Sequence, residues 1–259
     1  TYTLAATMEH GGAPAAGRLS FQVSAVPHRD TPLTVSAVGL DASVVRWLKG
    51  QGITAVGLDA ASADTNTVIL VGNGDETVLS PAVRREILRR TAQGSVALML
   101  DADAFRKGDD AVGWIPLAKK GQLTGFSDWL YHKECVAKKS AFFEGLAPQG
   151  VMDWDYYGPI ISSRFFEGLD TPESVAAAAF AVCHSSRPDG YAAGIMLGAY
   201  SFGAGRFVVN TFNILPNIDR HPAADRLLLN MIDYGLSSVK EPPASLPADF
   251  DATLSAVGY

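Results

Sequence analysis

Short apolar segments alternate with amphipathic segments between residues 33 and 100, and this alternation limits the chain to few folds. Asp41 or Ser43 can cap one intervening helix, and Ser80, which is followed by Pro81, can cap another. Strands that alternate with helices form βαβ units, in which the strands run parallel with right-handed crossovers. The sequence therefore predicts a parallel sheet with strands at residues 33–38, 53–58, 67–72 and 96–100.

Two carboxylates, Asp101 and Asp103, follow the strand predicted at residues 96–100. Because ligands of open α/β sheets bind at the carboxyl ends of strands, both are candidate groups for sugar hydroxyls or a cation. The alternative is that they cap the next segment, since turns favour aspartate for local reasons. Hydrolases on such sheets carry their nucleophile at this turn, and here it offers only carboxylates and alanines.

The region from residue 106 to residue 172 is rich in aromatic side chains and less regular, and residues 134–143 are expected to form a short helix. Carbohydrate sites often stack a sugar on Trp or Tyr and bind its hydroxyl groups with carboxylates. On a strand, Asp153 and Asp155 would point the same way. The alternative is that the aromatic residues only pack this region onto the sheet. The candidate ligand-binding residues here are Trp154, Asp155, Tyr156 and Tyr157.

The first 30 residues differ from the rest, because they predict two strands separated by a turn at residues 10–14. Leu19, Phe21 and Val23 alternate with polar residues, so one face of the second strand is expected to be buried. A lone hairpin is marginally stable in water. We therefore interpret residues 1–30 as the last strands of a preceding β-sandwich domain, and the chain as a piece of a longer polypeptide.

The later part of the chain is regular again. Three strands are predicted at residues 175–184, 192–200 and 205–212, and His221-Pro222 opens a last helix. The proline-containing tail at residues 241–259 is expected to form a surface strap.

The composition of the chain narrows the classes of partner that it is expected to bind. The 259 residues carry a net charge of −6, which argues against nucleic acid and anionic membranes as partners. No apolar stretch approaches the roughly 20 residues needed to span a bilayer. Cys135 and Cys183 are expected to be thiols, and Cys183 cannot pair with His184 because neighbours on a strand face opposite ways. His132, Glu134 and Cys135 lack a fourth metal ligand, so no cofactor or metal is predicted.

Several segments resemble a known family. The chain is similar to the class I (flavodoxin-like) glutamine-amidotransferase-like domains at the carboxyl side of bacterial glycoside hydrolases, including family 2 enzymes of the β-galactosidase type. The likeness covers residues 31–240. The segments that carry it are 129–133, 143–146, 152–158, 203–211 and 221–230.

The resemblance implies a fold and a role. The expected fold is α/β, a three-layer α/β/α domain with a mostly parallel central sheet at residues 31–240, preceded by a short β hairpin. True amidotransferases carry a Cys where this chain has Asp101-Ala102-Asp103. The implied role is a non-catalytic accessory domain, structural or oligomerising, of a secreted or periplasmic glycoside hydrolase. Its expected partners are other domains of the same polypeptide, with carbohydrate and a second copy as further candidates. The alternative function is a carbohydrate-binding module that uses the aromatic residues of the 106–172 region.

Overall fold

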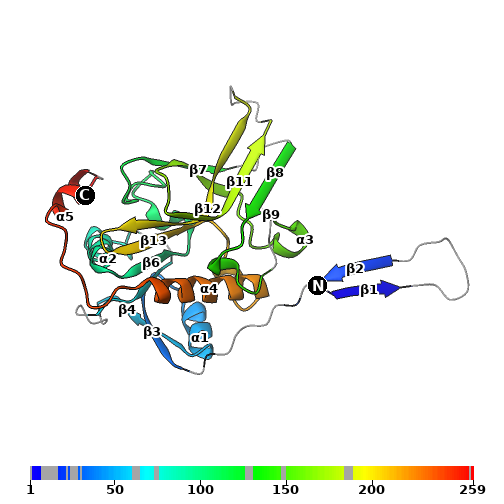
Figure 1. The fold of residues 1–259 in the computed structure, drawn as a ribbon, viewed down its shortest axis with the longest axis horizontal. Coiled ribbons are helices and arrows are strands. Elements are labelled where there is room, and N and C mark those ends of the chain that lie inside the picture. The colour runs from blue at the N-terminus through cyan, green and yellow to red at the C-terminus, as the bar shows by residue number, and fades with distance from the viewer. Residues whose placement is uncertain are drawn as a thin grey trace, which may run out of the picture.

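The computed structural model describes most of the chain (Figure 1). The described residues are 2–6, 17–21, 23, 29, 31–59, 65–72, 76–125, 131–146, 150–183, 189–256, 258 and 259. Trp129 and His184 therefore lie outside them.

The predicted hairpin is present at the beginning of the chain. Strands β1 (Tyr2–Ala6) and β2 (Gly17–Phe21) pair antiparallel, with Tyr2 opposite Phe21 and Leu4 opposite Leu19. They form a sheet of their own, apart from the rest of the fold (Figure 1).

Five parallel strands build one half of the main sheet, in the order β4-β3-β5-β6-β13. Both β5 and β6 are fully buried along their length, which suits their continuous apolar sequences. The strands are β3 (Leu33–Val38), β4 (Ile53–Gly57), β5 (Val68–Val71), β6 (Val96–Met99) and β13 (Gly205–Asn210).

Helices cover both faces of this parallel half. Val68 and Leu70 pack with α1 (Ala42–Gly50) and α4 (Pro222–Ser238), whereas Ile69 and Val71 pack with α2 (Pro81–Gln93). The start of α2 matches its sequence signals, since the Ser80 hydroxyl accepts a hydrogen bond from the Val83 amide and Pro81 is the first helical residue.

The other half of the sheet is antiparallel and continues from β13 through β12, β11, β8 and β9. A further strand, β10, pairs with both β12 and β7. These strands are β7 (Lys120–Gly125), β8 (Tyr131–Ala137), β9 (Gly150–Val151), β10 (Arg164–Leu169), β11 (Ser174–Val182) and β12 (Tyr191–Phe202).

The predicted three-layer α/β/α fold with a mostly parallel sheet is wrong. Within the described residues the sheet has eleven strands and is mixed, with six antiparallel pairings and four parallel ones. The physical reason is that β11, β12 and β13 follow one another closely along the chain, and such neighbours pair antiparallel. The short helix expected over residues 134–143 is wrong for most of its length, because β8 extends to Ala137 and only η2 (Ala141–Phe143) is helical there.

Short helices complete the structure. Residues 241–259, predicted as a strap, contain α5, which buries Phe250 and Leu254 against the α2 side of the sheet. Among the described residues no helix is long and apolar enough to cross a membrane. The remaining helices are η1 (Ala102–Phe105), η2 (Ala141–Phe143), α3 (Trp154–Tyr157), η3 (Leu215–Asn217) and α5 (Phe250–Ala256).

The carboxylate of Glu86 on α2 should make the unfolding free energy depend on pH. Hydrogen bonds from Arg89 and Arg90 lower the pKa of Glu86 to about 2. Burial raises this pKa, but the hydrogen bonds outweigh it. Because this pKa lies below the unfolded value near 4.5, the stabilisation is complete above that pH and is lost as pH falls toward 2. We expect Glu86→Gln to lower the unfolding free energy at pH 7 by about 1 kcal/mol and to flatten its pH dependence in this window, measured by urea unfolding. Asp189→Asn, at an exposed residue, is the matched control.

A close backbone approach joins β3 to β5. The Gly72 amide donates to the Val38 carbonyl at 2.9 Å, and a Cβ added at Gly72 would lie 2.2 Å from the Gly39 carbonyl oxygen. Gly72→Ala should therefore destabilise the fold by about 2 kcal/mol or more in thermal unfolding, because backbone atoms must move. Gly50→Ala, which meets nothing within 4 Å, should be neutral. Equal melting temperatures for the two variants would contradict this packing.

Candidate ligand-binding site

Both aspartates predicted after the strand at residues 96–100 form local structural contacts. Asp101 is the N-cap of η1, and its Oδ1 accepts a hydrogen bond from the Asp103 amide at 2.8 Å. Asp103 accepts hydrogen bonds from Arg106 Nη2 on Oδ1 at 2.5 Å and from Arg164 Nη1 on Oδ2 at 2.8 Å. The capping alternative therefore describes Asp101, and the carboxylate of Asp103 ties η1 to the beginning of β10.

The electrostatics of Asp103 agree with a structural ion pair. Partial burial raises its pKa, but the hydrogen bonds from Arg106 and Arg164 outweigh burial and hold the pKa below its usual value. The carboxylate is therefore ionised at neutral pH with both oxygens occupied, which makes it a poor proton donor for glycoside cleavage.

The aromatic candidates lie on the single-turn helix α3 and point in different directions. Trp154 is 47% exposed, whereas Tyr157 is 1% exposed and belongs to the core. The half-buried ring of Tyr156 lies against His221, with ring centroids 5.4 Å apart. Asp155 is exposed, and its amide donates to the N-cap carboxylate of Asp153 at 2.9 Å.

This arrangement differs from the predicted strand. Because residues 154–157 are helical, Asp153 and Asp155 do not form the pair of parallel carboxylates that the strand interpretation required. Trp154 has an exposed aromatic surface, whereas Tyr157 is buried and has no surface for a ligand to contact.

The thiols do not form a nucleophilic site. Burial, with a contribution from Glu134, raises the pKa of Cys135 to about 12, so this thiol is not ionised at neutral pH. Cys183 is exposed and unbridged. Among the described residues no group of three or more His, Cys, Asp or Glu side chains could hold a metal ion.

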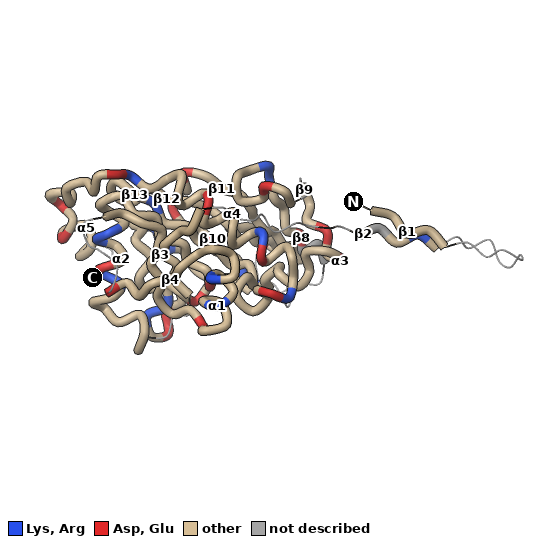
Figure 2. The backbone as a smooth tube through the Cα atoms, turned by 90° about the horizontal axis from the view of Figure 1, so that it is seen from below, with Lys and Arg blue, Asp and Glu red and all other residues tan. Residues whose placement is uncertain are grey.

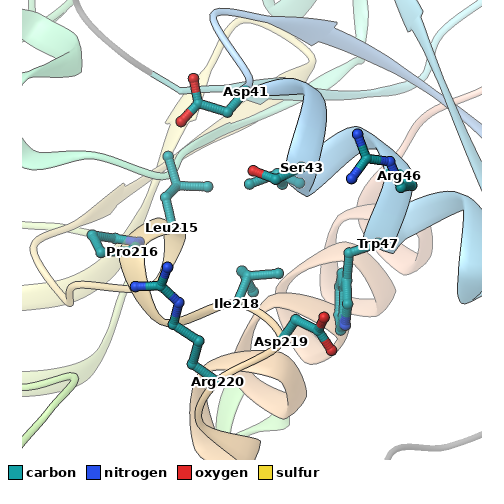
Figure 3. Close-up of a pocket in the computed structure, with 10 residues that line it drawn as sticks. Asp41, Ser43, Arg46, Trp47, Leu215, Pro216, Ile218, Asp219 and Arg220 are labelled. Atoms are coloured by element: carbon teal, nitrogen blue, oxygen red, sulfur yellow. The ribbon is translucent and has the colours of Figure 1, made fainter.

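The structure reveals a pocket that the sequence did not predict, here called the α1 pocket. It has a volume of about 570 Å³, within the usual range of small-molecule sites of roughly 300–1,000 Å³. One wall comes from the first turns of α1, and the other comes from the loop that contains η3 and precedes α4 (Figure 3). It is lined by Asp41, Ser43, Val44, Arg46, Trp47, Leu215, Pro216, Ile218, Asp219 and Arg220.

The α1 pocket lies at a change in strand order. From β3 the chain crosses through α1 to β4 on one side, and the next strand, β5, pairs on the other side of β3. Ligands of open α/β sheets bind at such switch points, outside the carboxyl ends of the strands. Asp41 and Ser43 follow β3 at this end, so the pocket occupies the position where a ligand is expected.

A second cavity, of about 600 Å³, lies between the ends of β3 and β4 and helix α2. Its lining is mostly apolar, and its charged pair is already satisfied, because Arg90 Nε donates to Glu86 at 2.6 Å. The α1 pocket offers more polar groups and is therefore the better candidate site.

The loop of the α1 pocket also contacts the region of α3. Asn217 Nδ2 donates to the Pro159 carbonyl at 3.0 Å, and the Asn213 amide donates to the Ile160 carbonyl at 2.8 Å. The loop that lines the α1 pocket is therefore also in contact with the segment that follows α3.

Sequence reasoning missed this site for identifiable reasons. Trp47 lies on the same helix as the buried residues Val44 and Leu48, so its sequence context indicates core packing; it is half-buried, with its indole at the pocket wall (Figure 3). Asp41 is the N-cap residue by position, but its side chain makes no capping hydrogen bond. The left-handed backbone of Asp219 (φ 61°) has no sequence marker beyond the tolerance of aspartate for that conformation.

Comparisons with known proteins add little to this geometry. No family model matches the chain, and no curated protein matches it. A solved structure, the β-galactosidase from Bacillus circulans sp. alkalophilus, aligns with a TM-score of 0.40 and 11% identity over 82% of this chain. The alignment covers 32% of that enzyme, so the chain spans about a third of its length. A similarity of this degree assigns no activity.

The structural role of Asp103 can be tested by mutation. Asp103→Asn removes the charge that holds Arg106 and Arg164, so we expect a loss of about 1 kcal/mol, or a few °C in melting temperature. Because the folded-state pKa of Asp103 is lowered, the difference from wild type should shrink as acid protonates the wild-type carboxylate. Calorimetric melting at pH 7 and pH 3 measures both effects. An unchanged melting temperature at pH 7 would contradict the structural role.

Proposed function

We propose that this chain is a non-catalytic accessory domain of a carbohydrate-active enzyme, a secreted or periplasmic glycoside hydrolase, and that it packs against other domains of the same polypeptide. The observation that carries the proposal is the exposed apolar face of the β1–β2 hairpin. The resemblance of the sequence to carboxyl-terminal modules of glycoside hydrolases supports the class of parent enzyme.

The strand register places the large apolar side chains of the hairpin on one face. Residues directly opposite in an antiparallel pair share a face, so Tyr2, Phe21, Leu4 and Leu19 lie together, and the first two rings stack at 5.5 Å. These four side chains are 44–62% exposed. The only charged residue on either strand is Arg18, which is paired with Ala5 and therefore lies on the opposite face.

Such a face favours a covering partner. Two strands alone are marginally stable in water, and burying each large apolar side chain contributes about 1–3 kcal/mol. A second sheet packed face to face, as in a β-sandwich, buries this type of surface. An apolar sheet of a neighbouring domain is therefore the partner that the hairpin fits best.

The contacts of the reactive groups support a non-catalytic role. Asp103 is held by two arginines, and the raised pKa of Cys135 keeps its thiol protonated. Along the part of the backbone that the structure describes, acidic and basic residues are interspersed (Figure 2).

Photo-crosslinking tests the packing proposal. With benzoylphenylalanine in place of Leu4 in the native polypeptide, we expect an adduct to a segment of the same polypeptide outside these 259 residues, mapped by mass spectrometry. The same substitution at Thr3, on the opposite face, should give little adduct.

Other outcomes of that experiment are equally informative. Adducts between the hairpins of two copies would replace the proposal with a homo-oligomeric interface. Equal labelling from Leu4 and Thr3 would show that the apolar face has no fixed partner. Turnover of chromogenic glycosides that disappears in Asp103→Asn while the fold persists would overturn the non-catalytic role.

Carbohydrate binding by α3 is a second candidate function. It is favoured by the 47% exposure of Trp154, which leaves an aromatic surface for a sugar ring beside the exposed carboxylate of Asp155. Loss of saccharide binding in Trp154→Ala would support it.

A further inference from the structure

We infer that the α1 pocket binds a small neutral saccharide. The class of ligand rests on the proposed function, and the location rests on the geometry of the pocket. Three independent features of the pocket support the inference: the charges of the lining, its aromatic wall and the fixed position of the loop.

The charged groups of the pocket are balanced. Asp41 and Asp219 contribute two carboxylates, while Arg46 and Arg220 contribute two guanidinium groups. Within the part of the chain that the structure describes, none of these four side chains is engaged in an ion pair. A balanced lining attracts neither anions nor cations strongly, but it offers both acceptors and donors, which suits a ligand with many hydroxyl groups.

The pocket also has an aromatic wall and an apolar floor. Trp47 is half-buried at one side, and the lining also includes the buried side chains of Val44 and Ile218. In Figure 3 the guanidinium group of Arg220 points into the cavity, across from α1. A pyranose ring presents an apolar C–H face and a polar edge, and a site with an aromatic side chain beside several polar groups can contact both.

Hydrogen bonds hold the loop that precedes α4 in place. Asp225, which is 9% exposed, accepts a hydrogen bond from the Asp219 amide at 2.8 Å, and this contact fixes the left-handed backbone of Asp219. Asn217 Nδ2 also donates to the Asn213 carbonyl at 2.8 Å. The polar wall is therefore preorganised, which lowers the ordering cost of binding.

Calorimetry with defined saccharides tests the inference. We titrate the 259-residue chain with galactose, lactose, cellobiose and xylobiose, and expect at least one to bind with a Kd at or below the millimolar range. Trp47→Ala should weaken that binding at least tenfold. The matched control is Tyr191→Ala, which removes an exposed aromatic ring at the beginning of β12 and should change the Kd less than twofold.

A second variant separates binding from folding. Arg220→Ala alters an exposed side chain of the loop and should weaken binding at least threefold with an unchanged melting temperature. Binding lost in Trp154→Ala and kept in Trp47→Ala and Arg220→Ala would move the site to α3 and overturn the inference. No binding of any of the four sugars would also overturn it, while the accessory role, which the crosslinking experiment tests, would stand.

Discussion

The burial of β5 and β6 on both faces is the constraint on which the rest of the structure depends. Val68–Val71 and Val96–Met99 have no exposed position, so helices must cover the sheet on both sides. Helix α1 therefore crosses on one face and α2 on the other, and the strand order reverses at β3. That reversal leaves the α1 pocket at the carboxyl end of β3. The position of the pocket thus follows from the packing of the helices on the sheet, in which the lining residues Val44 and Ile218 take part.

The two proposals concern different parts of the molecule and depend on different interactions, apolar burial at the hairpin and polar contacts at the α1 pocket. The hairpin face is a flat apolar surface without charge, which suits another sheet, whereas the α1 pocket is concave and mixes charges with one aromatic side chain. An accessory domain can use both, since one surface attaches it to its parent and the other contacts a ligand. The Asp101–Asp103 turn, which lies where a hydrolase would carry its nucleophile, instead joins η1 to β10.

Local patterns predicted the elements better than their assembly. The apolar segments between residues 33 and 100, the Ser80-Pro81 signal and the hairpin all correspond to observed elements, because each depends on neighbours in sequence. The mostly parallel sheet was wrong because the direction of β12 and β11 depends on their close succession along the chain and on long-range pairing. Residues 134–143 illustrate the same limit, since pairing with β11 keeps β8 extended through Ala137.

By itself, the sequence determined the strands and helices between residues 33 and 100 and that the turn after β6 holds carboxylates in place of a nucleophile. Only the tertiary structure decided what those carboxylates do, because Arg106 and Arg164 reach Asp103 from different elements. It also decided that Tyr157 is core while Trp154 is exposed, because one helical turn points them in different directions. The α1 pocket joins Trp47 to Asp219 and Arg220 across more than half of the chain, and no local pattern carries information over that separation.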